Sequence, residues 1–211
     1  MHSLTLPLKR TIHSLFLLGM LLIGSIADAS DEISIKLANE SKSERRTEQQ
    51  LRRILTEYDL SRWTFARSVV IDEKEIPHSH PVLTLHARHV NDDELLLSTY
   101  LHEQLHWFLS QHPAETLAAT RELKRIYPHV PVGFPQGSSD KDGNYEHLLV
   151  IYLEYRANQS LMGELKAREV MSFWSEDHYT WIYREVLKNP EKVGKVLKAH
   201  GLVPSKRGAE V

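Results

Sequence analysis

The chain has 211 residues, with 26 Lys and Arg against 28 Asp and Glu, a formal net charge of −2 and no cysteine. The near-balance of charge gives no reason to expect a nucleic acid or an anionic membrane as a partner, and the length suits one domain with a proper core. The absence of cysteine excludes a disulfide framework. It also limits any zinc site to His, Asp and Glu, a donor set more usual for catalytic than for structural zinc.

Residues 1–29 have the pattern of a secretory signal peptide. The basic pair Lys9-Arg10 precedes an apolar run, Ile12–Ile26, and Ala27-Asp28-Ala29 fits a small-residue cleavage site. The run is short for a membrane span. We therefore expect cleavage rather than a retained anchor, which leaves a periplasmic or secreted protein that begins at Ser30 and has no stable membrane anchor.

The segment 30–46 is polar and is expected to be a loosely held lead-in to a single domain over 47–211. Thr47–Gln50 matches a capping box. Apolar residues follow at helical spacing, which predicts a helix as far as Leu60; they are Leu51, Ile54, Leu55 and Tyr58.

Two strands are expected next. Trp63–Ile71 is rich in β-branched and aromatic residues, and Val82–Ala87 follows a polar turn. Pro77 and Pro81 precede the second run, which indicates a strand at the edge of its sheet. Acidic residues at Asn91–Glu94 then mark the start of a helix that runs from about 92 to 110.

The second half of the chain is mainly helical by pattern. A helix is predicted to begin at Pro113 and to end before Pro128, and Tyr127–Gly143 is a long loop rich in proline and glycine. A strongly apolar helix is predicted from Asn144 to about Gly163. Two more helices, Tyr179–Leu187 and Glu191–His200, close the domain, and the late aromatics are expected to pack in the core; they are Phe173, Trp174, Tyr179, Trp181 and Tyr183.

The residues that carry chemistry are His102-Glu103-Gln104-Leu105-His106, inside the helix predicted over 92–110. Two histidines at i and i+4 project from one helical face, so both imidazoles can reach one ion at about 2.0–2.1 Å. Glu103 is offset from that face, where it can hold a metal-bound water and take its proton. The alternative is an amphipathic helix whose two histidines are merely exposed or hydrogen-bonded.

This segment resembles the active-site helix of the zincin metallopeptidases. The resemblance covers the helix and one possible ligand helix downstream, not the whole chain. It implies that His102 and His106 bind Zn²⁺ and that Glu103 is the general base. The elements along the chain predict an α+β architecture, a small β-sheet beside a predominantly helical bundle, and the resemblance implies that this fold is zincin-like. The strand 82–87 would be the edge strand that pairs with an extended substrate.

A third ligand is needed, and Glu154 is the first candidate. Its helix is apolar almost all round, and a buried carboxylate needs a partner or a metal ion. With Glu154 the site resembles the gluzincin type, in which a glutamate on a second helix completes the ligand set and an acidic or amide group four residues on, here Asn158, supports a ligand histidine. The alternative for Glu154 is a salt bridge to Arg156 or Arg88.

His147 and His112 are the other candidates. His147 lies two turns before Glu154, about 10 Å along the axis, so the two are not expected to bind the same ion. We expect His147 to stabilise the oxyanion, or to be the third ligand with Glu154 as its support. His112 occupies the third histidine position of the metzincin pattern, but Leu109 stands where that pattern requires glycine.

The remaining polar candidates are given lesser roles. Tyr145 and Tyr155 are possible oxyanion donors but are expected to be packing residues. Four histidines around the second strand are expected to be surface residues rather than cleft residues; they are His78, His80, His86 and His89.

Together these patterns predict a zinc-dependent peptidase with a peptide or protein substrate. The alternatives are a metal-binding protein of similar fold without peptidase activity and a helical interaction domain with a coincidental motif.

Overall fold

The fold was taken from a computed structural model, which describes residues 1–2 and 32–206. Apart from its first two residues, the expected signal peptide and its cleavage site lie outside the described residues. No helix among the described residues is long and apolar enough to cross a membrane.

A small parallel sheet forms one side of the molecule. Its strands are β1 (Ser34–Leu37), β2 (Ser68–Ile71) and β3 (Leu83–Leu85), in that spatial order. Parallel neighbours need a crossover connection, and α1 (Lys42–Glu57) supplies it between β1 and β2. The segment expected to be a loose lead-in, 30–46, therefore contains a strand and the first turn of a helix, which corrects that expectation.

The outer edge of β3 is not free. Thr84 exchanges two backbone hydrogen bonds with His78, at 3.1 and 2.8 Å, in an antiparallel bridge. The chain's own 74–79 segment thus covers the edge at the centre of the strand. The expectation that β3 offers a free edge to a substrate is wrong at this position, because its main-chain groups are already paired.

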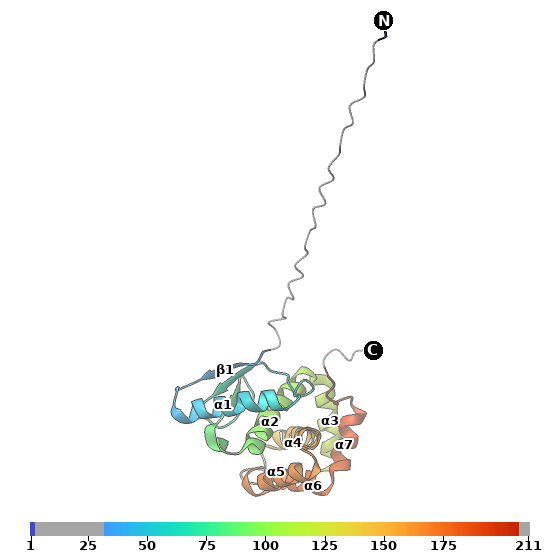
Figure 1. Ribbon diagram of the computed structural model, residues 1–211. Helices are drawn as coiled ribbons and strands as arrows, with labels where there is room; N and C mark the ends of the chain where they lie inside the picture. The colour runs from blue at the N-terminus through green and yellow to red at the C-terminus, as the bar shows by residue number, and fades with distance from the viewer. Residues whose placement is uncertain (3–31, 207–211) are drawn as a thin grey trace. The chain divides into compact units, whose positions relative to one another are not determined.

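The helices pack around α4 (Lys141–Met162), which contacts α2 (Asp93–Gln111), α3 (Pro113–Ile126), α5 (Glu164–Asp177), α6 (Thr180–Lys188) and α7 (Pro190–Ala199). Figure 1 shows α4 enclosed by other helices, with the sheet and α1 to one side. This explains why the sequence of α4 is apolar on nearly every face of the helix. The expected α+β architecture, a small sheet beside a helical bundle, is confirmed at this level.

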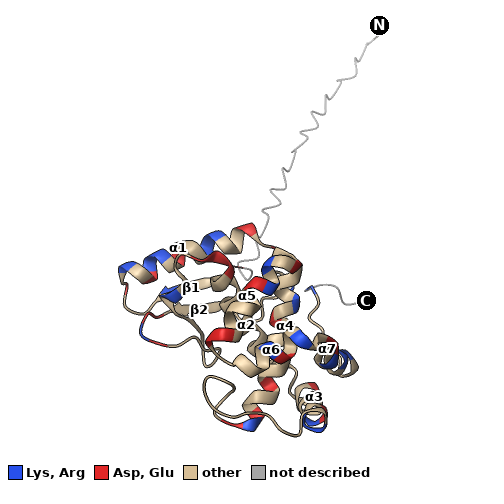
Figure 2. Ribbon diagram, turned by 90° about the horizontal axis from the view of Figure 1, so that it is seen from below, with Lys and Arg blue, Asp and Glu red and all other residues tan. Residues whose placement is uncertain are grey.

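The first helix begins earlier than its pattern predicts. Ser41 and Glu44 form the capping box, so α1 starts at Lys42 rather than at the expected Thr47. Its buried face packs on β1 and β2. Its solvent face mixes charges of both signs, as Figure 2 shows, and pairs Arg52 with Glu48 one turn away.

The two helices that carry the candidate site begin at side-chain caps. Asp92 accepts from the backbone N–H of Leu95 at 2.9 Å to start α2, and Asp140 accepts from Gly143 at 2.8 Å to start α4. Both starts agree with the predicted helices to within about three residues. A short 3₁₀ turn, η1 (Ala87–His89), leads into α2. The sequence did not predict α5, which follows α4 after a single glycine, Gly163, at a positive φ of 85°.

Candidate metal centre

The segment His102–His106 lies in the middle of α2, as predicted. Leu101 and Leu105 are fully buried and Phe108 is nearly so, which fixes the helix against the core. His102 and Glu103 are 7 % and 6 % exposed. Because the helix is held by its apolar face, the two histidines have a defined direction.

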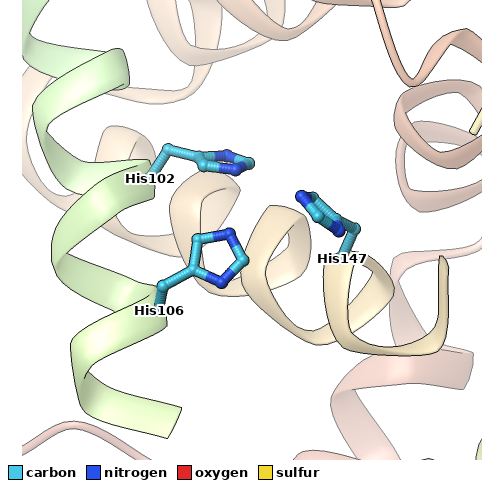
Figure 3. Close-up of side chains that lie close together, drawn as sticks. All are labelled: His102, His106 and His147. Atoms are coloured by element: carbon cyan, nitrogen blue, oxygen red, sulfur yellow. The ribbon is translucent and has the colours of Figure 1, made fainter. Parts of the chain in front are cut away.

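The partner of this pair is His147, from the first third of α4. One ligand atom from each of His102, His106 and His147 can be chosen so that all three lie within 4.8 Å of one another. Figure 3 shows the first two projecting from one helix toward the third on the neighbouring helix. Three imidazoles from two helices therefore surround a space that a single ion can fill.

Each of the three imidazole rings is held through its own Nδ1 atom. The Nδ1 of His102 bonds to Glu154 Oε2 at 2.9 Å, the Nδ1 of His106 to Glu146 Oε1 at 2.9 Å, and the Nδ1 of His147 to the Gly143 carbonyl at 2.7 Å. A carbonyl only accepts, so His147 carries its proton on Nδ1. With all three Nδ1 atoms engaged, Nε2 is left as the ligand atom of each ring.

Glu154 is therefore not part of the ligand set, contrary to the prediction. It is fully buried and contacts the Nδ1 edge of His102, away from Nε2. Its oxygens also accept from Ser98 Oγ at 2.5 Å and from the Tyr183 hydroxyl at 3.0 Å. His147, rather than Glu154, lies with His102 and His106 in the group that could hold a metal ion, and the histidine that Glu154 contacts is His102, not His147.

A buried network stands behind Glu154. Ser98 Oγ accepts from Trp174 Nε1 at 3.1 Å and from Asn158 Nδ2 at 3.0 Å. The indole N–H can only donate, so the proton of the Ser98 hydroxyl is directed to Glu154. Asn158 thus supports the site through Ser98 rather than by touching a ligand histidine.

The other predicted candidates lie elsewhere. His112 ends α2 and bonds through Nδ1 to the Phe108 carbonyl at 2.8 Å, outside the histidine cluster. Tyr145 donates to the Tyr127 carbonyl and Tyr155 to Glu164. Neither tyrosine lines the cavity described below, so neither is an oxyanion donor.

Burial sets the protonation of the ligand histidines. It lowers the pKa of His102 well below its usual range, and the charges of His106 and His178 act in the same direction. It also lowers the pKa of His147 to about 3. Both rings are neutral at physiological pH, which is the form that binds a metal ion.

Burial has the opposite effect on the carboxyls. It raises the pKa of Glu103 to about 8, with the charge of Glu154 adding to the rise. It raises the pKa of Glu154 to about 7, while the hydrogen bonds from Ser98 and Tyr183 act to lower it. Glu146 differs, because the hydrogen bond from His106 is the largest effect and lowers its pKa. A bound cation would favour the ionised form of Glu103.

The three histidines and Glu103 line a cavity of about 1020 Å³, a volume at the upper end of ordinary ligand sites. Its walls include the segments 74–79, 86–89 and 133–139. The side chains of Ile76 and Phe134, from two of these walls, are 78 % and 83 % exposed. The space beside the histidines is therefore reachable by a molecule larger than water.

Several cavity residues were missed or misjudged from the sequence. Three of the four histidines expected at the surface line the cavity, and the fourth, His80, stacks on Trp107 instead. Tyr179 and Tyr183 were expected in an aromatic core cluster but also face the cavity. The place of Ser98 near the site could have been inferred from its spacing alone, since it lies one helical turn before His102.

The chemistry of this donor set fits a metal ion, since three imidazoles, each anchored through Nδ1, meet beside a carboxyl group that borders a cavity. Comparison of the chain with protein-family models, with curated proteins and with solved structures found no match.

Proposed function

We propose that the protein is a zinc-dependent peptidase of zincin-like fold. The observation that carries the proposal is the common Nδ1 anchoring of His102, His106 and His147 beside Glu103. Three histidines with an open remaining position are a ligand set of catalytic zinc, which lowers the pKa of a bound water and polarises a carbonyl. Zinc is favoured over harder cations because all three donors are imidazole nitrogens.

Glu103 is the residue assigned to proton transfer. Its carboxylate would accept a proton from the attacking water and deliver it to the leaving nitrogen of the peptide bond. The burial that raises its pKa favours this role, since a general base that must also act as an acid works best near the ambient pH. The cavity volume of about 1020 Å³ leaves room for a short stretch of a peptide beside the histidines.

The expected periplasmic or secreted location rests on residues 1–29, which carry the signal-peptide pattern. Expression of the full chain with export, followed by N-terminal sequencing of the purified protein, tests it. Cleavage is expected before Ser30. A mature protein that retains Met1 would contradict the export proposal and leave the site chemistry unaffected.

The metal and the reaction need separate tests. Protein purified without chelators should contain about one zinc per chain, and His147→Ala should lose it. Glu103→Gln should keep the zinc and lose about 10²–10⁴-fold in cleavage of a fluorescently labelled unfolded protein. Glu164→Gln, which changes an exposed carboxyl outside the cavity, is the matched control and should retain activity.

Each negative result has its own meaning. Wild-type protein without stoichiometric zinc would refute the metal centre. Zinc-loaded protein that cleaves nothing, in the wild type as in Glu103→Gln, would instead favour a metal-binding protein without peptidase activity.

A further inference from the structure

Tyr179 has a backbone conformation that few tyrosines adopt. Its φ of 47° and ψ of 35° are left-handed, and in the described part of the chain Glu40, at φ 52°, is the other non-glycine residue with positive φ. Glu40 lies in an exposed loop, whereas Tyr179 is partly buried beside the candidate metal centre. Bulky residues rarely hold this conformation, and such strain gathers at functional sites.

The conformation is held by the wall of the cavity. Tyr179 is the N-cap of α6 and gives that helix no side-chain cap. Instead the N–H of Thr180 donates to the Pro135 carbonyl at 2.9 Å, and the N–H of Trp181 donates to the Gln136 carbonyl at 3.2 Å. These bonds satisfy the free N–H groups at the start of α6 and fix the backbone directly after Tyr179.

The loop that supplies these carbonyls is itself anchored. The side chain of Asn144, at the start of α4, donates to the Pro131 carbonyl and accepts from the N–H of Ser138, both at 2.7 Å. The position of Tyr179 is therefore fixed through the same helix that carries His147.

The ring of Tyr179 lies against the ligand histidines. Its centroid is 4.1 Å from that of His147, and it is nearly parallel to His102, at 6.4 Å and 4°. The residue lines the same cavity as Glu103. Its strained backbone thus places a phenol beside the space that the three Nε2 atoms surround.

The hydroxyl of this phenol is available. Among the described residues it has no hydrogen-bond partner, and it is protonated at neutral pH. The other tyrosine that lines the cavity, Tyr183, has its hydroxyl committed to Glu154. Tyr179 is therefore the cavity tyrosine that can donate to a bound molecule.

We propose that Tyr179 is a catalytic residue that donates a hydrogen bond to the oxygen of the scissile carbonyl. As the water oxygen bonds to the carbonyl carbon, the electron pair of the C=O bond moves to that oxygen and the water proton goes to Glu103. The Tyr179 hydroxyl stabilises the resulting negative charge and keeps its own proton. This inference rests on the proposed peptidase function and adds the residue that would bind the oxyanion.

The test removes the hydroxyl and keeps the ring. Tyr179→Phe retains the backbone and the stacking on His147, and the matched control is Tyr155→Phe, whose hydroxyl bonds to Glu164 outside the cavity. Once the wild type has cleaved an unfolded protein, one cleaved site is made as a synthetic peptide, together with its phosphonate analogue, a tetrahedral anion. Zinc content, kcat, KM and calorimetric affinity for the phosphonate are then measured.

For Tyr179→Phe we expect unchanged zinc content, KM within about twofold, and kcat reduced by about 10²-fold, since an oxyanion donor acts in the transition state. Its affinity for the phosphonate should fall by at least tenfold. Tyr155→Phe should match the wild type in all four measurements.

A Tyr179→Phe variant with wild-type kcat, or one that raises KM alone, would overturn the assignment and leave the proposed function standing. A zinc-loaded wild type that cleaves nothing would refute the proposed function itself and this inference with it.

Discussion

Replacement of Glu154 by Gln should weaken zinc binding more than the same change at Glu146. Each carboxylate holds the Nδ1 of one ligand histidine at 2.9 Å, so the two bonds have the same length. They differ in burial, because the side chain of Glu154 is 1 % exposed and that of Glu146 is 45 % exposed. Water can take the place of Glu146 but cannot reach the position of Glu154.

The buried network makes Gln a poor substitute despite its matching shape. If the amide NH₂ replaces Oε2, it faces the donors His102 and Tyr183. If it replaces Oε1, it faces Ser98, whose oxygen already accepts from Trp174 and Asn158. Either orientation of the Gln amide leaves hydrogen-bond donors facing each other in a buried site, which costs free energy.

Loss of a group that orients a ligand histidine typically reduces metal affinity by about 10–100-fold, or ~1.4–2.7 kcal/mol. We expect Glu154→Gln at the upper end of this range. Glu146→Gln should cost about tenfold or less, because exposed pairs contribute little.

The assay is competition for zinc against a fluorescent chelator, with Glu164→Gln, an exposed carboxyl that bonds to Tyr155, as the control. Folding is checked on the zinc-free protein. There Glu154→Gln should be less stable than the wild type by roughly 1–3 kcal/mol, because of the buried opposed donors, but should still fold. A zinc affinity of Glu154→Gln within twofold of the wild type, or a larger loss in Glu146→Gln, would refute the reasoning.

Three further outcomes follow from the structure. Gly137→Ala should destabilise the protein by roughly 1–3 kcal/mol in denaturant titration, because the added Cβ would lie 2.3 Å from Asn144 Oδ1 and 2.6 Å from the Pro131 carbonyl; a wild-type midpoint would show that the loop can move. The hydrogen bond from Arg88 lowers the pKa of Asp177 from 3.8 to about 2, so this pair contributes stability above pH 4 that is lost as the pH falls toward 2. Asp177→Asn should accordingly be less stable than the wild type at pH 7 and equal to it near pH 2 in thermal melts; a difference that persists at pH 2 would contradict this. Zinc at 100 times its dissociation constant should stabilise the fold by about 2.7 kcal/mol, and a chelator should reverse the gain. A melting temperature that neither zinc nor the chelator changes would argue against a site formed by the folded state.

The parts of the site that local geometry determines could be predicted from the sequence. His102 and His106 are one turn apart on a helix with clear start signals, so their common direction follows from helical spacing alone. The position of Glu103 beside them follows in the same way. Strand lengths and the start of α1 were less predictable, because Ser41 and Glu44 form a capping box six residues before the one that the sequence favoured.

The third ligand could not be predicted, since it depends on how α4 lies against α2. His147 and Glu154 are seven residues apart and share one stripe of α4, so periodicity places both toward the histidine pair. One of these two residues can face the Nε2 atoms of the histidine pair and the other the Nδ1 atom of His102. Which is which depends on the position of α4 along α2. That position is set by packing with many distant residues and leaves no local pattern.

The surroundings of Glu154 nevertheless distinguish a metal ligand from a group that supports one. Burial favours the neutral form of Glu154 and raises its pKa to about 7, while the hydrogen bonds from Ser98 and Tyr183 act to lower it. Three donors converge on its oxygens, which is the arrangement that holds a buried carboxylate in one orientation. A metal ligand must keep a lone pair directed at its ion, whereas the oxygens of Glu154 already accept three hydrogen bonds from the protein. A carboxyl on an all-apolar helix, with Ser98 one turn before the first histidine, is therefore better interpreted as the support of a ligand than as the ligand.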